Sequence, residues 1–78
     1  MNRYYIDVTV RNKAGVLNRI TSIFSRLYIN IDSLTLSNAE VGDYAKISFG
    51  FRCTPEENSI LVGRVGKILD VCSIEEIR

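Results

Sequence analysis

The 78-residue sequence contains no histidine, no tryptophan, a single proline and only two cysteines. Without histidine there is no imidazole that titrates near neutral pH, which removes a frequent general base and the commonest metal ligand. Cys53 and Cys72 lie too far apart for a C-x-x-C motif, and no histidine is present to complete a zinc site. The composition therefore favours two reduced thiols that act as small apolar side chains over a disulfide or redox role.

A strong net charge and long apolar runs are also missing. Ten Lys and Arg residues face nine Asp and Glu residues, so the net charge of +1 predicts no nucleic-acid or anionic-membrane partner. No segment reaches the roughly 20 apolar residues of a transmembrane helix. The N-terminal sequence MNRYYIDVTV lacks the basic start and apolar run of a signal peptide. We therefore expect a cytoplasmic protein, with residues 1–78 forming a single domain.

The first half of the chain alternates and then changes period. Residues 4–11 alternate apolar and polar positions, which predicts a strand with one buried face. The sequence NKAG interrupts this pattern, and a helix is predicted from Val16 onward. Its apolar stripe consists of Val16, Leu17, Ile20, Ile23, Phe24, Leu27 and Tyr28.

The second half predicts two strands, a helix and a last strand. In YINIDSLTLS, Asp32 shares one face with Leu34 and Leu36, and Ile31 shares the other with Ser33 and Thr35. A hairpin loop is predicted for NAEVGD, and the next strand covers residues 44–52 with four inward apolar side chains: Ala45, Ile47, Phe49 and Phe51. TPEE predicts a capping box at the second helix, with Thr54, Pro55 and Glu57 in the cap positions. Its stripe is Leu61, Val65, Ile68 and Leu69, and the last strand is VCSIEEIR.

This order of elements predicts an α+β, ferredoxin-like βαββαβ fold: a four-stranded antiparallel sheet with two helices on one face. The uncovered face is expected to carry Thr9, Thr35, Ser48 and Arg52, together with Tyr5 and Ile31. Apolar residues on that face, and the unpaired backbone of an edge strand, suggest a second subunit.

Catalytic chemistry is poorly represented. The aspartates lie in separate predicted elements, and Glu75 and Glu76 fall at a strand end. The sequence GRVG inside the second helix is a poor match to a phosphate-binding loop. A non-catalytic chain without catalytic residues or a metal site is therefore expected.

The start of the first predicted helix indicates a ligand site. A helix leaves its first four N–H groups without partners, and neither Ala14 nor Gly15 carries a capping side chain. These N–H groups and the helix dipole suit a carboxylate, and the Asn12 amide offers both donors and an acceptor. The alternatives stay open: Asn12 and Gly15 as turn residues, and Asn30 as the positive-φ residue that ends the helix.

The segment RNKAGVLNRITSIFSRLYINIDSLTLS resembles the ACT domain of the regulatory small subunit of acetolactate synthase, also called acetohydroxyacid synthase. That family typically shows an Asn, two variable residues and Gly, then an amphipathic helix with FSR and a strand with NID/ESLT. The matching residues here are Asn12, Gly15, Leu17, Phe24, Ser25, Arg26, Asn30, Ile31, Asp32, Ser33, Leu34 and Thr35. KILDV at residues 67–71 also resembles the family, so the likeness covers nearly the whole chain.

The resemblance implies a non-catalytic regulatory subunit that activates the catalytic large subunit in branched-chain amino acid biosynthesis. It implies a homodimer through sheet edges, with valine or a related amino acid bound between the two copies. The ligand-binding residues would be Asn12, Gly15, Val16 and Leu17 of one copy and Asn30 and Ile31 of the other. Thiamine diphosphate, FAD and magnesium would belong to the catalytic partner.

Two features of the sequence depart from the family. Many members carry a second domain after the ACT domain, whereas this sequence resembles the short regulatory subunits. The loop also has Lys13 and Ala14 where an acidic residue and a proline or serine are frequent. The alternatives are a free-standing ACT sensor that regulates another enzyme or a transcription regulator, and a self-assembling module without ligand.

Overall fold

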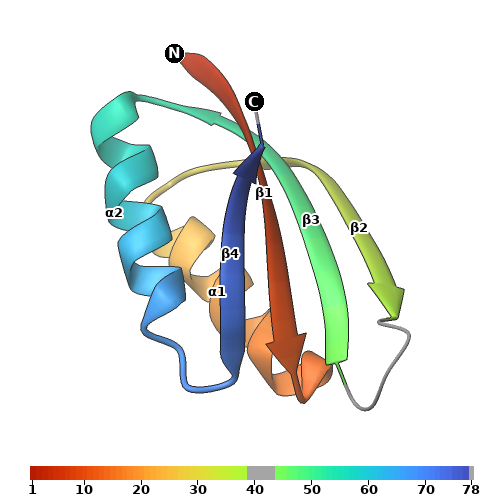
Figure 1. The fold of residues 1–78 in the computed structure, drawn as a ribbon. Coiled ribbons are helices and arrows are strands. Elements are labelled where there is room, and N and C mark those ends of the chain that lie inside the picture. Colours follow the sequence, from red (N-terminus) through yellow and green to blue (C-terminus); the bar gives the residue numbers. More distant parts are fainter. Residues whose placement is uncertain (39–43, 78) are drawn as a thin grey trace.

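The computed structural model describes residues 1–38 and 44–77, and it has the predicted order of elements (Figure 1). The strands are β1 (Asn2–Arg11), β2 (Ile31–Asn38), β3 (Tyr44–Cys53) and β4 (Val71–Ile77), and the helices are α1 (Lys13–Arg26) and α2 (Pro55–Gly66). All neighbouring strands pair antiparallel in the order β2-β3-β1-β4, with both helices on one face of the sheet. The ferredoxin-like fold is therefore confirmed. Within the described ranges, neither helix has the length and apolarity required to cross a membrane.

The core lies between the sheet and the two helices, as predicted from the alternating apolar residues of the strands and the apolar stripes of the helices. β1 and β3 form the centre of the sheet, and their alternate side chains Ile6, Val8, Ile47 and Phe49 are at most 1% exposed. Phe24 of α1 fills the middle of this layer. The centroid of its ring lies 5.2 Å from that of Phe49 and 5.1 Å from that of Phe51.

The first helix ends in a hydrogen-bonded turn centred on a tyrosine. The Tyr28 N–H donates to the Ser25 carbonyl and the Ile29 N–H donates to the Phe24 carbonyl, which together form a Schellman motif. Tyr28 takes the left-handed conformation, with φ of 57°, and its side chain is 96% exposed. Its predicted place in the buried stripe is therefore wrong, because the helix ends at Arg26.

A bulge near the start of β2 reverses the predicted faces of two residues. Ile31 pairs with Phe51 and Ser33 pairs with Gly50, so the register shifts at Asp32. Ile31 consequently packs against the core, and its prediction for the outer face is wrong. A strictly alternating pattern has no way to anticipate the inserted residue.

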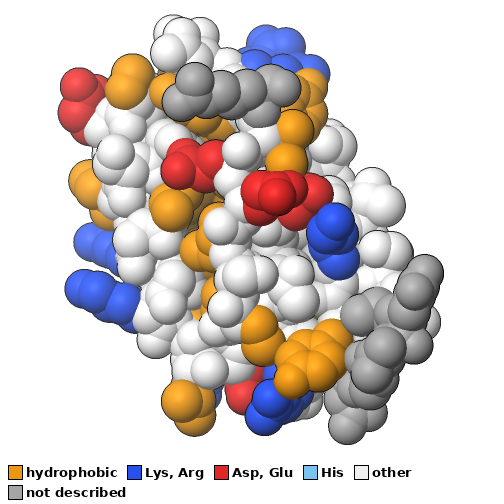
Figure 2. Space-filling view, viewed as in Figure 1, with side chains coloured by type: hydrophobic (Ala, Val, Ile, Leu, Met, Phe, Trp, Pro, Cys, Tyr) orange, Lys and Arg blue, Asp and Glu red, His pale blue; other side chains and the backbone are white. Residues whose placement is uncertain are grey.

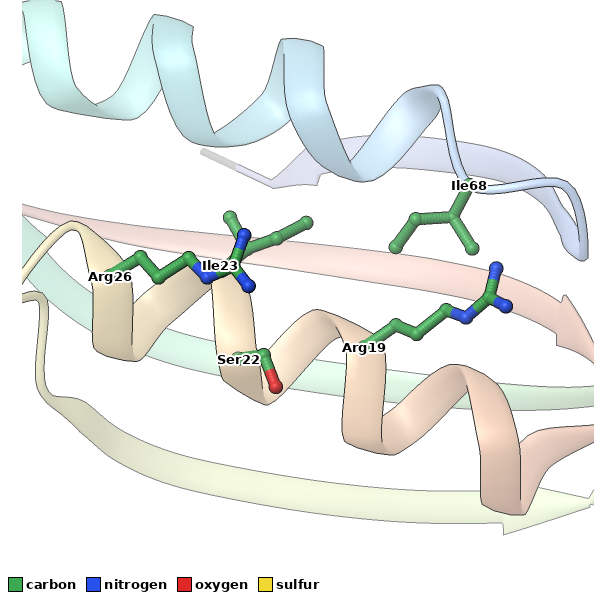
Figure 3. Close-up of a pocket in the computed structure, with 5 residues that line it drawn as sticks. All are labelled: Arg19, Ser22, Ile23, Arg26 and Ile68. Atoms are coloured by element: carbon green, nitrogen blue, oxygen red, sulfur yellow. The ribbon is translucent and has the colours of Figure 1, made fainter.

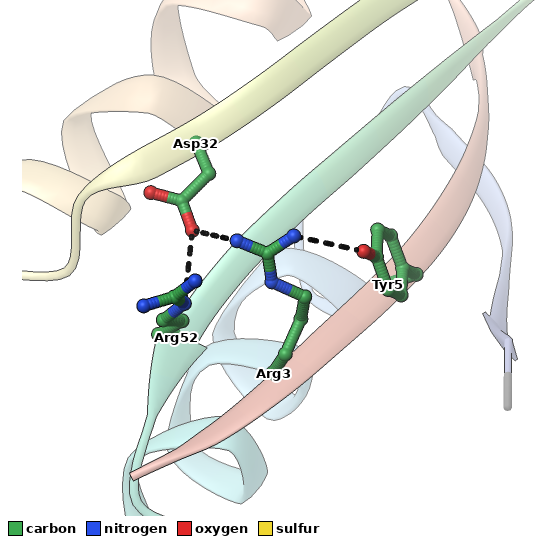
Figure 4. Close-up of polar contacts among 4 residues, drawn as sticks. All are labelled: Arg3, Tyr5, Asp32 and Arg52. Carbon is green, nitrogen blue, oxygen red and sulfur yellow. Dashed lines mark hydrogen bonds and ion pairs between the residues drawn. The ribbon is translucent and has the colours of Figure 1, made fainter.

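The bulge is accompanied by an ion-pair network on the uncovered sheet face (Figure 4). Asp32 accepts a hydrogen bond of 3.2 Å from Arg3 and lies 3.7 Å from the Arg52 Nε, while Arg3 also donates to the Tyr5 hydroxyl over 3.2 Å. Lys46 lies 3.7 Å from Asp7 on the same face. Figure 2 shows this face with acidic and basic side chains close together. Opposite charges therefore pair across the strands.

Two further predictions concern the loops. α2 ends at Gly66, before Leu69, which is 88% exposed and thus not part of a buried stripe. Ile68, its neighbour, does pack against the core. The predicted hairpin NAEVGD falls on residues 39–43 after Asn38 and lies outside the described residues.

Candidate functional site

Helix α1 begins earlier than its apolar stripe suggests. Its first residue is Lys13, and Asn12 is the N-cap, so the predicted start at Val16 is wrong by three residues. Gly15 is the third helical residue and not the cap. Asn is among the preferred N-cap residues, so this signal was present in the sequence. The apolar stripe marks only where the helix becomes buried, because Lys13, Ala14 and Gly15 are all exposed.

The cap of α1 is unusual because its side chain makes no capping bond. Asn12 adopts the left-handed conformation, with φ of 54° and ψ of 60°, and its side chain accepts no hydrogen bond from the first turn. An N-cap side chain ordinarily reaches those N–H groups from the extended region. The Asn12 carbonyl accepts the first helical bond from the Val16 N–H over 3.2 Å. Within the helix, the N–H groups that lack an intrahelical partner are therefore those of Lys13, Ala14 and Gly15, whereas the sequence placed them at Gly15 to Leu17.

The chain itself does not require glycine at position 15. Gly15 lies in a helix without positive φ, and a Cβ built on it meets only the Asn12 side-chain amide, at 3.4 Å. This is an ordinary van der Waals contact, so alanine fits. Glycine in a helix interior costs about 1 kcal/mol relative to alanine. The missing Cβ instead leaves the Asn12 amide and the backbone donors accessible from outside.

The electrostatic surroundings of this helix start favour an anion. The first turn holds no acidic residue. Lys13 Nζ donates to the Asn38 Oδ1 over 3.2 Å, which places a positive charge between α1 and the end of β2. The partial positive charge of the helix dipole adds to it. A carboxylate is the group best matched to these donors.

Asn30 and Ile31 lie at the other end of α1. The helix has 14 residues, so Asn12 and Asn30 are separated by about 20 Å along its axis. One amino acid therefore cannot touch both residues of the same chain. Asn30 is exposed and lines an open hollow of about 410 Å³ with Met1, Tyr28, Asp32 and Arg52. It is not the residue that ends α1, since Tyr28 has that role.

The remaining reactive groups in the described part of the chain do not form a metal site. Among the described residues, no three Cys, Asp or Glu side chains gather as metal ligands would. Cys53 is buried and Cys72 is exposed, and both are free thiols. Burial raises the pKa of the Cys53 thiol, and the charge of Glu57 raises it further.

Comparison with known sequences identifies the family. A family model described as "AHAS small subunit-like ACT domain" matches residues 6–73. The acetolactate synthase small subunit of Bacillus subtilis is 34% identical over 73 residues, which cover 92% of this chain and 42% of the relative. The probable acetolactate synthase small subunit of Archaeoglobus fulgidus is 28% identical over 96% of this chain and 47% of its own length. The chain thus spans less than half the length of these curated relatives.

Solved structures agree with the fold. The acetolactate synthase small subunit from Thermotoga maritima superposes with a TM-score of 0.86 at 19% identity, over the whole of this chain and 48% of the other. The ACT domain of the GTP pyrophosphokinase from Chlorobium tepidum gives 0.74 at 24% identity, over 96% of both chains. The family match covers most of the sequence, including the start of α1. This chain therefore belongs to the acetolactate synthase small-subunit family of ACT domains.

Proposed function

We propose that this chain is a regulatory, non-catalytic subunit of acetolactate synthase in branched-chain amino acid biosynthesis. In this proposal it activates the catalytic large subunit and senses valine or a related amino acid. The observation that carries the proposal is the uncapped start of α1 within a chain of this family. The large subunit would hold the thiamine diphosphate, FAD and magnesium, and this chain would hold none. The free thiols Cys53 and Cys72 agree with a cytoplasmic location.

The effector would bind between two copies of the chain. Its carboxylate would accept hydrogen bonds from the N–H groups of Lys13, Ala14 and Gly15, and the Asn12 amide would orient it. Asn30 of the second copy would approach its polar end. Apolar side chains near the interface, among them Leu17 and Ile31, would surround its aliphatic group. The Val16 side chain, which the sequence placed in the site, is 1% exposed and packs in the core. The separation of about 20 Å between Asn12 and Asn30 supports a site made by two chains.

The edge strand β2 supports the same arrangement. Its Leu34 and Leu36 pair with Phe49 and Ile47 and so belong to the helix side of the sheet, yet they are 41% and 42% exposed. Antiparallel pairing of two β2 edges would bury these leucines. It would also bring the start of one β2, with Asn30, to the end of the other, where Asn38 bonds Lys13. A homodimer through sheet edges would thus account for both halves of the proposed site.

Titration calorimetry with valine, leucine and isoleucine tests the effector site. The wild-type chain is expected to bind at least one of them, and Asn12→Gly and Asn30→Ala are each expected to weaken binding at least tenfold. Glycine preserves the left-handed backbone at position 12 and removes only the amide. Asn18→Ala is the matched control, because Asn18 is an exposed α1 asparagine outside the site. No binding at millimolar concentration would rule out the sensor.

A second candidate is a free-standing ACT sensor that regulates another enzyme or a transcription regulator. The observation in its favour is that the same fold occurs outside acetolactate synthase subunits, as in the ACT domain of the GTP pyrophosphokinase. Co-purification with the acetolactate synthase large subunit of the same organism separates the two candidates. Amino-acid binding without any association with the large subunit would favour the second.

A further inference from the structure

A groove with two arginines lies on the helix layer, away from the start of α1. We call it the arginine groove; it measures about 290 Å³ and is lined by Arg19, Ser22, Ile23, Arg26 and Ile68. Figure 3 shows both arginines along α1, with Ile23 and Ile68 in the space between this helix and the end of α2. Its floor is apolar, because Ile23 and Ile68 belong to the packed layer around the core. Its rim is basic.

The charges on this rim are not neutralised within the described part of the chain. The ion pairs among the described residues join Arg3, Lys46 and Arg52 to acidic residues of the sheet. None of these pairs includes Arg19 or Arg26. The sequence has no acidic residue between Asp7 and Asp32, although this segment carries four basic ones. The charges are therefore unevenly distributed despite the net charge of +1: all charged side chains of α1 are basic, whereas the sheet carries both acidic and basic side chains.

An exposed leucine follows one of the groove-lining residues in the chain. Leu69 follows Ile68 directly in the chain, and its side chain is 88% exposed. An apolar floor with a charged rim resembles the centre and border of a protein interface. The groove is therefore suited to a partner that presents apolar and acidic groups together.

We propose that the arginine groove binds a helical segment of another protein. This segment presents two carboxylates seven residues apart, about two helical turns, with an apolar side chain between them. Arg19 and Arg26 are separated by seven residues, or about 10 Å along the helix, which is the spacing of acidic residues at i and i+7. Guanidinium groups suit such carboxylates because they form paired hydrogen bonds. Ile23, Ile68 and Leu69 would contact the apolar side chain.

A second copy of this chain does not offer the required segment from its described helices. α1 has no acidic residue, and the two acids of α2, Glu56 and Glu57, are adjacent, with Glu57 engaged in its own capping box. The occupant is therefore a different protein. This inference rests on the proposed function for its identity, since the catalytic large subunit is the protein then expected to carry the segment.

The first measurement is the affinity of the chain for the large subunit of the same organism. Arg19→Gln with Arg26→Gln is expected to weaken it about tenfold and to reduce its salt dependence. Arg19→Lys with Arg26→Lys is expected to stay within threefold, because the charges remain. Arg64→Gln with Lys67→Gln removes the same net charge from α2 and its C-cap outside the groove and is the matched control. Equal affinity of the Gln pair and wild type, or an equal loss in the control, would overturn the proposal.

The second measurement examines the groove without the large subunit. The probe is a helical peptide with Glu at positions i and i+7 and Leu between them, compared with a peptide of the same composition whose Glu residues lie on the opposite face. In a ¹⁵N-labelled chain, the first peptide should shift the amide signals of residues 19–26 and 68–69, and the second should not. Shifts without large-subunit binding would support the groove and reject the proposed partner. No shifts with the first peptide would overturn the inference itself.

Discussion

The two helices of this domain begin in opposite ways. At α2 the Thr54 hydroxyl accepts from the Glu57 N–H over 3.2 Å, and the Glu57 carboxylate accepts from the Thr54 N–H over 2.9 Å. At α1 the cap residue, Asn12, contributes no such bond, and no acid lies in the first turn. The capping box satisfies two of the first donors of α2 within the chain, whereas the Asn12 side chain satisfies none of those of α1. In a small domain that depends on every favourable contact, the second arrangement points to a binding role.

The largest expected effect comes from removing the cap that is complete. Thr54→Ala combined with Glu57→Ala removes both halves of the box and should lower the free energy of unfolding by about 2 kcal/mol. Asn12→Gly should change it by less than about 0.5 kcal/mol, because no capping bond is lost and glycine tolerates the left-handed conformation. Urea denaturation at one protein concentration measures both. A similar loss at both helix starts would contradict the comparison.

A substitution at the start of α1 should raise the free energy of unfolding, in contrast to the loss expected at the start of α2. Gly15→Glu adds helix propensity and a negative charge near the positive end of the dipole, so we expect stability to rise by about 1 kcal/mol. The same charge should repel a carboxylate ligand and weaken valine binding at least tenfold. Gly63→Glu is the control, because Gly63 belongs to the other helix, α2, and a Cβ there meets open space. Gly63→Glu should leave valine binding unchanged. A loss of stability in Gly15→Glu would show that the chain needs this glycine itself.

The C-terminal end of α1 provides a smaller test of the same contrast. Tyr28→Gly relieves the left-handed strain of an almost fully exposed residue and should stabilise the chain by about 0.5 kcal/mol. Leu27→Gly, one residue earlier, removes a half-buried side chain at φ of −90° and should destabilise it. Thermal unfolding of the two variants should therefore shift in opposite directions. A shift in the same direction would mean that the Tyr28 side chain has a structural role.

The smallest effect concerns the thiols, one of which lies directly before the capped helix. Iodoacetamide should modify the exposed Cys72 readily and the buried Cys53 only on unfolding. Because burial raises the pKa of Cys53, the folded chain keeps this proton at a pH where the unfolded chain loses it. Stability should therefore fall as pH rises above about 8.5, the ordinary pKa of a free thiol, and Cys53→Ala should reduce this fall. Fast modification of Cys53 in the folded chain would contradict its shielding.

The sequence predicted those features that depend on local chemistry. TPEE specifies the start of α2 completely, because every capping group lies within four residues. Alternation located β1 and β3, since the central strands of the sheet have one face on the core. The apolar stripe located the body of α1 for the same reason.

The predictions that were wrong concern residues whose environment is decided elsewhere in the fold. The inserted residue at Asp32 moved Ile31 to the core side, where it faces Phe51, while Asp32 itself joins Arg3 and Arg52. Leu69 fits a helical stripe, yet α2 stops at Gly66 and leaves it exposed. The distance between Asn12 and Asn30 follows from the length of α1 in the structure, whereas from the sequence their placement on different copies was implied only by the family resemblance. The ligand contacts of Asn12, Gly15, Val16, Leu17, Asn30 and Ile31 stay a prediction.

The position of Asn12 and Asn30 at opposite ends of α1 has a genetic consequence in the proposed pair. Each of the two pockets would take its Asn12 from one subunit and its Asn30 from the other. When Asn12→Gly chains are mixed with Asn30→Ala chains, the hybrid would hold one pocket with both defects and one with neither. Two defective alleles would then complement each other and restore half of the pockets in every hybrid.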